Sequence, residues 1–281
     1  MNNQYASIRG HYVPEGYLKF FTNDAVLLRV LDKKKNSVFF ATPRKVARKW
    51  NYYAVNTPDG PDNSLDAIFG SEIEAPAYEA IRQLQSGDIE HPNQKIILSV
   101  FLGFQMVRGP SLKNPLEEFM EKVSNDVLRI VFANEERAQD VMERARSAGH
   151  EIPDVSFETM VDFLQRDDFT ITEPTNVLWL KSILPNAAIL AQVWLDHDWI
   201  VLDAPEGKTF LTSDTPTPRS IPELLTKNAV PLTKTMAVTL LPQKSGTSYR
   251  VKINEEQLNG LNRKMKDRAL RFIFSSEEIP S

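Results

Sequence analysis

Five polar residues, spread over most of the sequence, have side chains suited to acid–base or ligand-binding chemistry. They are His11, Glu74, Gln105, Arg108 and Asp214. An imidazole or a carboxylate can transfer protons, while a guanidinium and an amide can bind phosphates and base edges. These types indicate hydrolysis, with His11, Glu74 and Asp214 as candidate catalytic residues and Gln105 and Arg108 as candidate substrate-binding residues.

Each of these side chains also has a purely structural interpretation. Arg108 follows Gln105 by three positions at the end of an apolar segment, where a charged group needs a partner. That partner could be Glu74 or Asp214 instead of a ligand phosphate. Asp214 could cap a turn through backbone hydrogen bonds, and His11 could fix the N-terminal segment to the core. The sequence leaves both interpretations open.

A second candidate region is the basic and aromatic stretch 44–53. Cations can contact phosphates and aromatic rings can stack on bases, so this pattern is typical of nucleic-acid binding. We expect the substrate-binding residues of this stretch to be Arg48, Lys49, Trp50 and Tyr53. Cations elsewhere could extend the same surface, namely Lys33, Lys34, Lys35, Arg263, Lys264, Lys266, Arg268 and Arg271. The alternative is a solvated charged face with its aromatic residues in the core.

Composition limits the other classes of chemistry. The chain of 281 residues has no cysteine, which excludes disulfides and thiolate nucleophiles. Its four histidines are scattered, without the paired spacing of zinc sites. No phosphate-binding loop or dinucleotide glycine fingerprint occurs. We therefore expect no metal and no cofactor, with a carboxylate site for magnesium as the alternative.

Hydropathy and charge limit location and partners. The sequence begins without a basic stretch followed by an apolar run, and no run of about eighteen apolar residues occurs, so we expect a cytoplasmic protein without membrane contact. The net charge of −4 argues against general attraction to nucleic acid. Any contact with DNA, the partner we expect, must therefore come from a local patch.

Apolar periodicity predicts the elements of the first half. The segments 25–31 and 37–42 flank a charged turn and indicate a β-hairpin. A helical pattern over 65–84 is interrupted by Pro76 and ends at Gly87. The segment 96–107 is apolar on nearly every face, which predicts a central buried helix that delivers Gln105 and Arg108 to the site.

The second half combines helices and strands. One or two amphipathic surface helices are predicted over 116–148 and another helix over 177–195. Strand candidates are 199–202, 209–211, 236–241, 249–253 and 272–274, and a last helix opens at Asn254 with Gln257 as a capping box. We predict one helix-rich α+β domain over 1–281, with a central buried helix and small antiparallel sheets, in which residues near 25–53 could form a β-hairpin lobe.

Several separated motifs together carry a family resemblance. They are His11-Tyr12-Val13-Pro14, Ile73-Glu74, Gln105-x-x-Arg108-x-Pro110, Trp199, Thr212-Ser213-Asp214-x-Pro216 and Pro231-Leu232. In order and spacing this set resembles the uncharacterised family known as DUF4238. The resemblance implies a bacterial protein, with some members associated with phage defence. It implies motif positions without a settled activity.

The reaction we predict is metal-independent hydrolysis of nucleic acid by a DNA glycosylase that excises modified bases in phage defence. Asp214 would orient water or stabilise the sugar cation, while His11 or Arg108 assists the departing base. Gln105 would contact that base. The alternatives are a metal-dependent nuclease, with a divalent ion on Glu74 and Asp214, and a non-catalytic sensor that binds a phage component.

Overall fold

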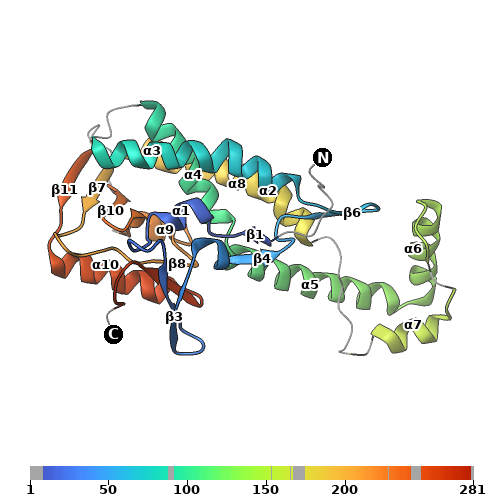
Figure 1. The fold of residues 1–281 in the computed structure, drawn as a ribbon. Helices are drawn as coiled ribbons and strands as arrows, with labels where there is room; N and C mark the ends of the chain where they lie inside the picture. The colour runs from blue at the N-terminus through green and yellow to red at the C-terminus, as the bar shows by residue number, and fades with distance from the viewer. Residues whose placement is uncertain are drawn as a thin grey trace. The chain divides into compact units, whose positions relative to one another are not determined.

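The computed structural model describes residues 9–87, 92–152, 154–164, 166, 175–226, 228–241 and 248–279. These residues form two compact units, the first Met1–Lys113 with Trp179–Ser281 and the second Asn114–Leu178 (Figure 1). The fold is helix-rich α+β with several small antiparallel and mixed sheets, as predicted. The single domain over 1–281 stays a prediction.

The predicted central helix is α4 (Pro92–Val107). It is buried throughout from Phe101 to Val107, whereas Ile96 and Val100 nearer its start are exposed. Gly103 allows close helix packing, since a Cβ there would lie 2.5 Å from the carbonyl oxygen of Ala187. Ala187 belongs to α8 (Thr175–Asp196), so the two helix backbones touch at this point.

Helix α8 contains a stretch, Val177–Asp196, that is long and apolar enough to cross a membrane by length and composition. One such helix is weak evidence, because core helices of soluble proteins have the same properties. A third of this stretch, 33%, is buried in the protein, including Trp179, Ile183 and Trp194.

Three consecutive helical segments precede α4. They are α2 (Ser64–Ile68), the π-helical turn η2 (Phe69–Glu74) and α3 (Ala75–Ser86). Pro76 lies in the first turn of α3, where a missing N–H removes no helical hydrogen bond, so a new helix begins there as predicted. The π-helical turn, which the sequence pattern did not indicate, ends at Glu74.

The predicted hairpin is β2 (Leu28–Asp32) with β3 (Ser37–Ala41), and it belongs to a four-stranded sheet ordered β3–β2–β12–β8. Strand β12 (Phe272–Ser275) pairs antiparallel with β2 and with β8 (Thr212–Ser213). The strand predicted over 209–211 is wrong by a few positions. The Phe210 and Leu211 amides bond to the Lys234 carbonyl and the Asn262 side chain, and strand pairing begins only at Thr212.

A second four-stranded sheet has the order β11–β7–β10–β9. Its strands are β7 (Trp199–Asp203), β9 (Val230–Thr233), β10 (Met236–Leu240) and β11 (Tyr249–Lys252). Because β11 runs parallel to β7, this sheet is mixed and not purely antiparallel. Helix α10 (Glu255–Arg268) lies along it (Figure 1), and its capping box of Asn254 and Gln257 is confirmed.

Small elements complete the first unit. Strand β1 (Arg9–His11) pairs antiparallel with β4 (Arg48–Trp50) in a two-stranded ribbon. The other small elements are α1 (Glu15–Lys19), the 3-10 turn η1 (Pro43–Lys45), the hairpin β5 (Val55–Thr57) and β6 (Gly60–Asp62), and α9 (Ile221–Leu224).

The second unit is helical in its described part. It contains most of α5 (Pro110–Phe132), then α6 (Glu135–Ser147) and α7 (Phe157–Leu164). The amphipathic pattern over 116–148 is therefore two helices. Asn134 separates them, and its side chain accepts a hydrogen bond from the Arg137 amide as an N-cap.

Candidate functional site

Arg108, directly after α4, is the centre of a buried polar cluster. Its Nη1 donates to Glu74 Oε1 at 2.6 Å, and its Nε donates to the Tyr53 hydroxyl at 2.8 Å. Its Nη2 donates to the carbonyl oxygen of His11 at 2.5 Å. The other Glu74 oxygen accepts from the Tyr78 hydroxyl at 2.8 Å. We call these residues, with Gln105, the Arg108 cluster.

Packing closes the Arg108 cluster against solvent. Arg108 is only 1% exposed, and its guanidinium carbon lies 4.9 Å from the Phe104 ring centre and 5.3 Å from that of Tyr53. An arginine surrounded in this way has its charge matched by Glu74 and its donors matched by protein oxygens. Of the two sequence interpretations, the structure therefore favours pairing with Glu74 over phosphate binding.

Gln105 lies within the same buried region and is 4% exposed. Its Nε2 donates to the carbonyl oxygen of Tyr12 at 3.4 Å, next to His11. Its buried Oε1 has no hydrogen-bond partner among the described residues. The amide thus holds the motif segment against α4, and it does not present an edge to solvent for a base.

His11 connects this cluster to the surface. Its carbonyl oxygen accepts from Arg108 and from the Tyr53 hydroxyl, whereas its half-buried ring hydrogen-bonds to the Arg44 backbone. Within the part of the chain that the structure describes, Nε2 has no hydrogen-bond partner. Burial lowers the pKa of His11, Glu15 opposes this shift, and Arg48 adds to it. The imidazole is therefore neutral at neutral pH, and its unpartnered Nε2 is buried from water in this structure.

Asp214 is held by backbone amides at the end of β8. Its Oδ1 accepts from Leu270 at 2.9 Å, and its Oδ2 accepts from Arg271 at 2.8 Å and from Phe272 at 2.9 Å. Burial raises the pKa of Asp214, and these hydrogen bonds oppose the shift. The carboxylate is 4% exposed, so the structure favours its capping interpretation.

Four of the five motif residues are joined by direct or neighbouring hydrogen bonds. His11, Glu74 and Arg108 bond directly, and Gln105 joins them through the carbonyl of Tyr12. Asp214 is linked less directly, since its charge contributes to the raised pKa of Tyr12, after burial. The motif residues thus gather around the N-terminal segment, but with their polar atoms largely directed at protein.

The ribbon of β1 and β4 presents a different arrangement. Arg9 faces Trp50 and His11 faces Arg48 in the register, so these four side chains share one side of the ribbon. The Arg9 guanidinium carbon lies 4.5 Å from the Trp50 ring centre, and Trp50 is 60% exposed. We call Arg9, His11, Arg48 and Trp50 the ribbon face. Lys49 points to the other side, 5.8 Å from the Tyr52 ring centre.

Two parts of the expected nucleic-acid surface are corrected by the structure. Tyr53 is fully buried and bonded to Arg108, so its ring cannot stack on a base in this structure. Lys33 donates to carbonyl oxygens at the end of α10, while Arg268 is buried and Arg271 pairs with Asp32 at 2.7 Å. These cations hold the fold together and are not available for phosphates.

Asp66 is an ionisable residue that sequence reasoning missed. Its Oδ1 lies 3.3 Å from where a Cβ of Gly10 would be, so it flanks β1 on the side away from the ribbon face. Burial raises the pKa of Asp66 to about 6, opposed by Arg108 and assisted by Glu74. An acidic residue at the start of a short helix is common, so its spacing carried no signal.

A metal does not fit the two carboxylates that the nuclease alternative requires. Glu74 pairs with Arg108 and accepts from Tyr78, while Asp214 accepts from backbone amides. The described residues also contain no group of three or more His, Asp or Glu side chains arranged to hold a metal ion.

Comparison with protein families identifies the family to which the chain belongs. The family model described as "Protein of unknown function (DUF4238)" matches residues 9–278. The chain therefore belongs to this family, as its motifs indicated. No curated protein and no solved structure matches it.

Proposed function

We propose that this protein binds DNA through the ribbon face. The observation that supports this proposal is the row formed by exposed Trp50, exposed Arg9, half-buried Arg48 and neutral His11. Arginines on such a row can contact phosphates, and an exposed indole can stack on an unpaired base. Arg44 and Lys45 in η1 are also exposed and lie next to β4 in the chain.

The activity that we propose beside this surface is hydrolytic release of a base, in defence against phage DNA. His11, not Asp214, is the proton acceptor in this proposal, because its Nε2 is buried without a hydrogen-bond partner within the described residues. The proposal therefore requires that DNA binding opens this nitrogen to water. Water would form a bond to the anomeric carbon while the glycosidic C–N bond breaks, and the base nitrogen would keep the electron pair. The water proton would pass to His11 and then to the departing base.

A second candidate is a non-catalytic DNA sensor. It is favoured by the hydrogen bonds that occupy Glu74, Arg108 and Asp214, which leave these three charged side chains little capacity to bind substrate. Such a protein would use the ribbon face only for binding. Measurement of released bases separates this candidate from the glycosylase.

Binding is tested with Trp50→Ala and fluorescence anisotropy on labelled single-stranded and duplex DNA. Loss of a stacked base should weaken binding about tenfold, within the ~1–3 kcal/mol of one base–aromatic contact. Phe119→Ala is the matched control, because Phe119 is 62% exposed but lies in the second unit. Equal affinities for wild type and Trp50→Ala would contradict a role of the ribbon face.

Catalysis is tested on modified and unmodified phage DNA by mass spectrometry of free bases and by labelling of abasic sites. His11→Gln keeps a donor for the Arg44 carbonyl but has no nitrogen that accepts a proton near neutral pH. We expect it to keep most of its DNA affinity, because Arg9, Arg48 and Trp50 of the ribbon face are unchanged, and to release no base. If wild type binds DNA but releases no base from any substrate, the sensor is the correct candidate.

A further inference from the structure

Two adjoining cavities lie on the α10 side of the first unit, and Arg268 in the lining of the second donates to the carbonyl oxygen of Pro216 at 3.2 Å. The first, of about 510 Å³, lies between the sheet containing β7, β10 and β11 and helix α10. Its walls are mainly aliphatic, with Ile200, Leu240, Val251 and Leu261 among them. We call it the α10 cavity. Its volume falls within the range of about 300–1,000 Å³ that is usual for small-molecule sites.

The helix side of the α10 cavity has a gap at Gly260. This residue lines the cavity, and a Cβ added there would meet no atom within 4 Å. Glycine is unfavourable inside a helix, by about 1 kcal/mol relative to alanine. Gly260 is exposed near the middle of α10, so it leaves the mouth of the cavity open on the helix side.

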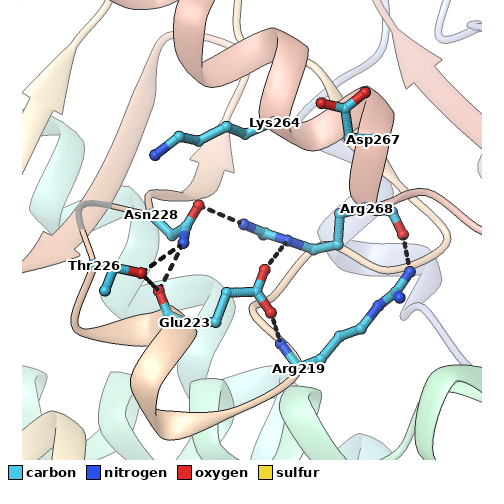
Figure 2. A pocket seen from close by; sticks show the side chains of 7 residues that line it. All are labelled: Arg219, Glu223, Thr226, Asn228, Lys264, Asp267 and Arg268. Atoms are coloured by element: carbon cyan, nitrogen blue, oxygen red, sulfur yellow. Dashed lines mark hydrogen bonds and ion pairs between the residues drawn. The ribbon is translucent and has the colours of Figure 1, made fainter.

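The second cavity, of about 300 Å³, is polar and is shown in Figure 2. Its charged lining consists of Arg219, Lys264 and Arg268 against Glu223 and Asp267. Three cations against two carboxylates leave one net positive charge. We call it the Arg268 cavity.

The buried guanidinium at the base of this cavity is held firmly. Arg268 donates from Nε to Glu223 at 3.1 Å and from Nη2 to Asn228 at 3.2 Å. The Arg219 Nη2 donates to the carbonyl oxygen of Arg268 at 2.5 Å, as Figure 2 shows. Arg219 and Arg268 are thus positioned by the protein before any ligand arrives.

The two cavities are continuous in their lining. Lys264 lines both, and the neighbouring residues Asn228 and Ala229 line the Arg268 cavity and the α10 cavity respectively. An aliphatic chamber therefore adjoins a chamber with one net positive charge, and a lysine stands at their junction. A neutral apolar molecule would use only the first chamber, and a small anion only the second.

We propose that the two cavities together bind an amphipathic carboxylate. An aliphatic body lies in the α10 cavity, and the carboxylate lies at the junction beside Lys264, facing the Arg268 cavity. One negative charge on the ligand matches the one net positive charge of the polar chamber. This site is independent of DNA binding at the ribbon face.

The test is calorimetric titration of the full-length protein with decanoate, decan-1-ol and decyl phosphate. We expect saturable binding of decanoate, weaker binding of the alcohol, and no preference for the phosphate over the carboxylate. Preference for decyl phosphate over decanoate would overturn the carboxylate assignment. Absence of saturable binding for all three compounds would overturn the site.

Substitutions locate the two ends of the ligand. Gly260→Leu fills the α10 cavity and should weaken decanoate binding at least tenfold, because each excluded methylene costs about fourfold in affinity. Gly260→Ala is its control and should bind nearly as well as wild type. Lys264→Met should weaken decanoate but not decan-1-ol, whereas Arg263→Met, which removes the neighbouring charge on α10, should change neither. Unchanged decanoate affinity in Gly260→Leu would overturn the proposal.

A measurement on the wild type does not depend on how the variants fold. A decanoate analogue with a terminal diazirine should label peptides from β7, β10, β11 or α10 after irradiation, in competition with decanoate. Labelling confined to other peptides would overturn the proposed position of the aliphatic body.

Discussion

The Arg108 cluster and the ribbon face share one residue, His11, but differ in the environment of their charged side chains. In the cluster, Arg108 is 1% exposed and its charge meets Glu74 at 2.6 Å. On the ribbon face, Arg9 is exposed and lies over the ring of Trp50. His11 belongs to both, because its carbonyl accepts from Arg108 while its ring lies on the ribbon face.

This difference indicates that the charges of the Arg108 cluster stabilise the fold, whereas those of the ribbon face are available to a ligand. In a buried ion pair, each charge compensates the other. Removing one partner leaves the other charge buried without compensation, which lowers the stability of the fold. An exposed cation beside an exposed ring contributes little to the stability of the fold, and its charge remains accessible to a ligand. We therefore expect substitutions in the cluster to lower stability, and substitutions on the ribbon face to lower DNA affinity.

Arg108→Met should have the largest effect on stability. It leaves the Glu74 carboxylate and the Tyr53 hydroxyl without their main partner. We therefore expect the free energy of unfolding, measured by urea titration, to fall by about 3–5 kcal/mol. Arg144→Met is the control, since Arg144 pairs with Asp140 at 2.8 Å on the surface and is 78% exposed. A loss below about 1 kcal/mol in Arg108→Met would contradict the structural interpretation of the cluster.

Asp214→Asn should have an intermediate effect. An amide can accept at one position only, so at least one of the three backbone amides at Leu270, Arg271 and Phe272 loses its acceptor. We expect a loss of about 1–3 kcal/mol in stability, with DNA binding unchanged. Thermal unfolding and anisotropy on the same samples distinguish the two effects. If Asp214→Asn has unchanged stability but binds DNA more weakly, Asp214 contributes to DNA binding and not only to the fold.

Much of the fold was predictable from local patterns. The apolar stretch over 96–107 predicted α4, the capping pattern predicted the start of α10, and alternation around a charged turn predicted β2 and β3. These signals are local, because each depends on residues within one element. The parallel pairing of β11 with β7 and the π-helical turn before α3 depend on distant contacts, and the sequence pattern did not indicate them.

The candidate site was predictable only in part, for a related reason. The motifs located residues that gather around His11, but residue type alone did not distinguish a ligand-binding arginine from Arg108 paired with Glu74. Tyr53 and Trp50 stand in the same stretch, yet one is fully buried and the other is 60% exposed. The register of β1 and β4 decides which side chains share a face, and it appears only in three dimensions.

The cations of the ribbon face should affect the salt dependence of DNA binding. If Arg9 and Arg48 each neutralise a phosphate, Arg9→Gln with Arg48→Gln should reduce the slope of log affinity against log salt by about two on duplex DNA. Stability should change by less than about 1 kcal/mol. The double variant of Arg144 and Arg146 to Gln, on α6, is the matched control. Lys49→Ala should have a smaller effect, since Lys49 lies on the other side of the ribbon.

Asp66 sharpens the comparison because it borders the cluster and interacts electrostatically with Arg108 and Glu74. Its folded-state pKa is raised to about 6 from an ordinary value of 3.8, mainly by burial. The folded state therefore holds a proton that the unfolded state releases, and stability falls as pH rises from about 4 to about 6. Above that range the charged carboxylate destabilises the fold by a constant amount, about 1–2 kcal/mol after solvent screening.

Asp66→Asn removes this charge while keeping the shape of the side chain. We expect the variant to be more stable than wild type at pH 7.5, by about 1–2 kcal/mol, and equal to it below about pH 4, where both folded and unfolded Asp66 are protonated. Urea unfolding at several pH values measures the difference. In the background of Arg108→Met the gain should grow, because Arg108 opposes the rise in the pKa of Asp66. If Asp66→Asn is less stable than wild type at pH 7.5, the charged Asp66 stabilises the fold as a paired member of the Arg108 cluster. The cluster would then extend to Asp66, on the side of β1 away from the ribbon face.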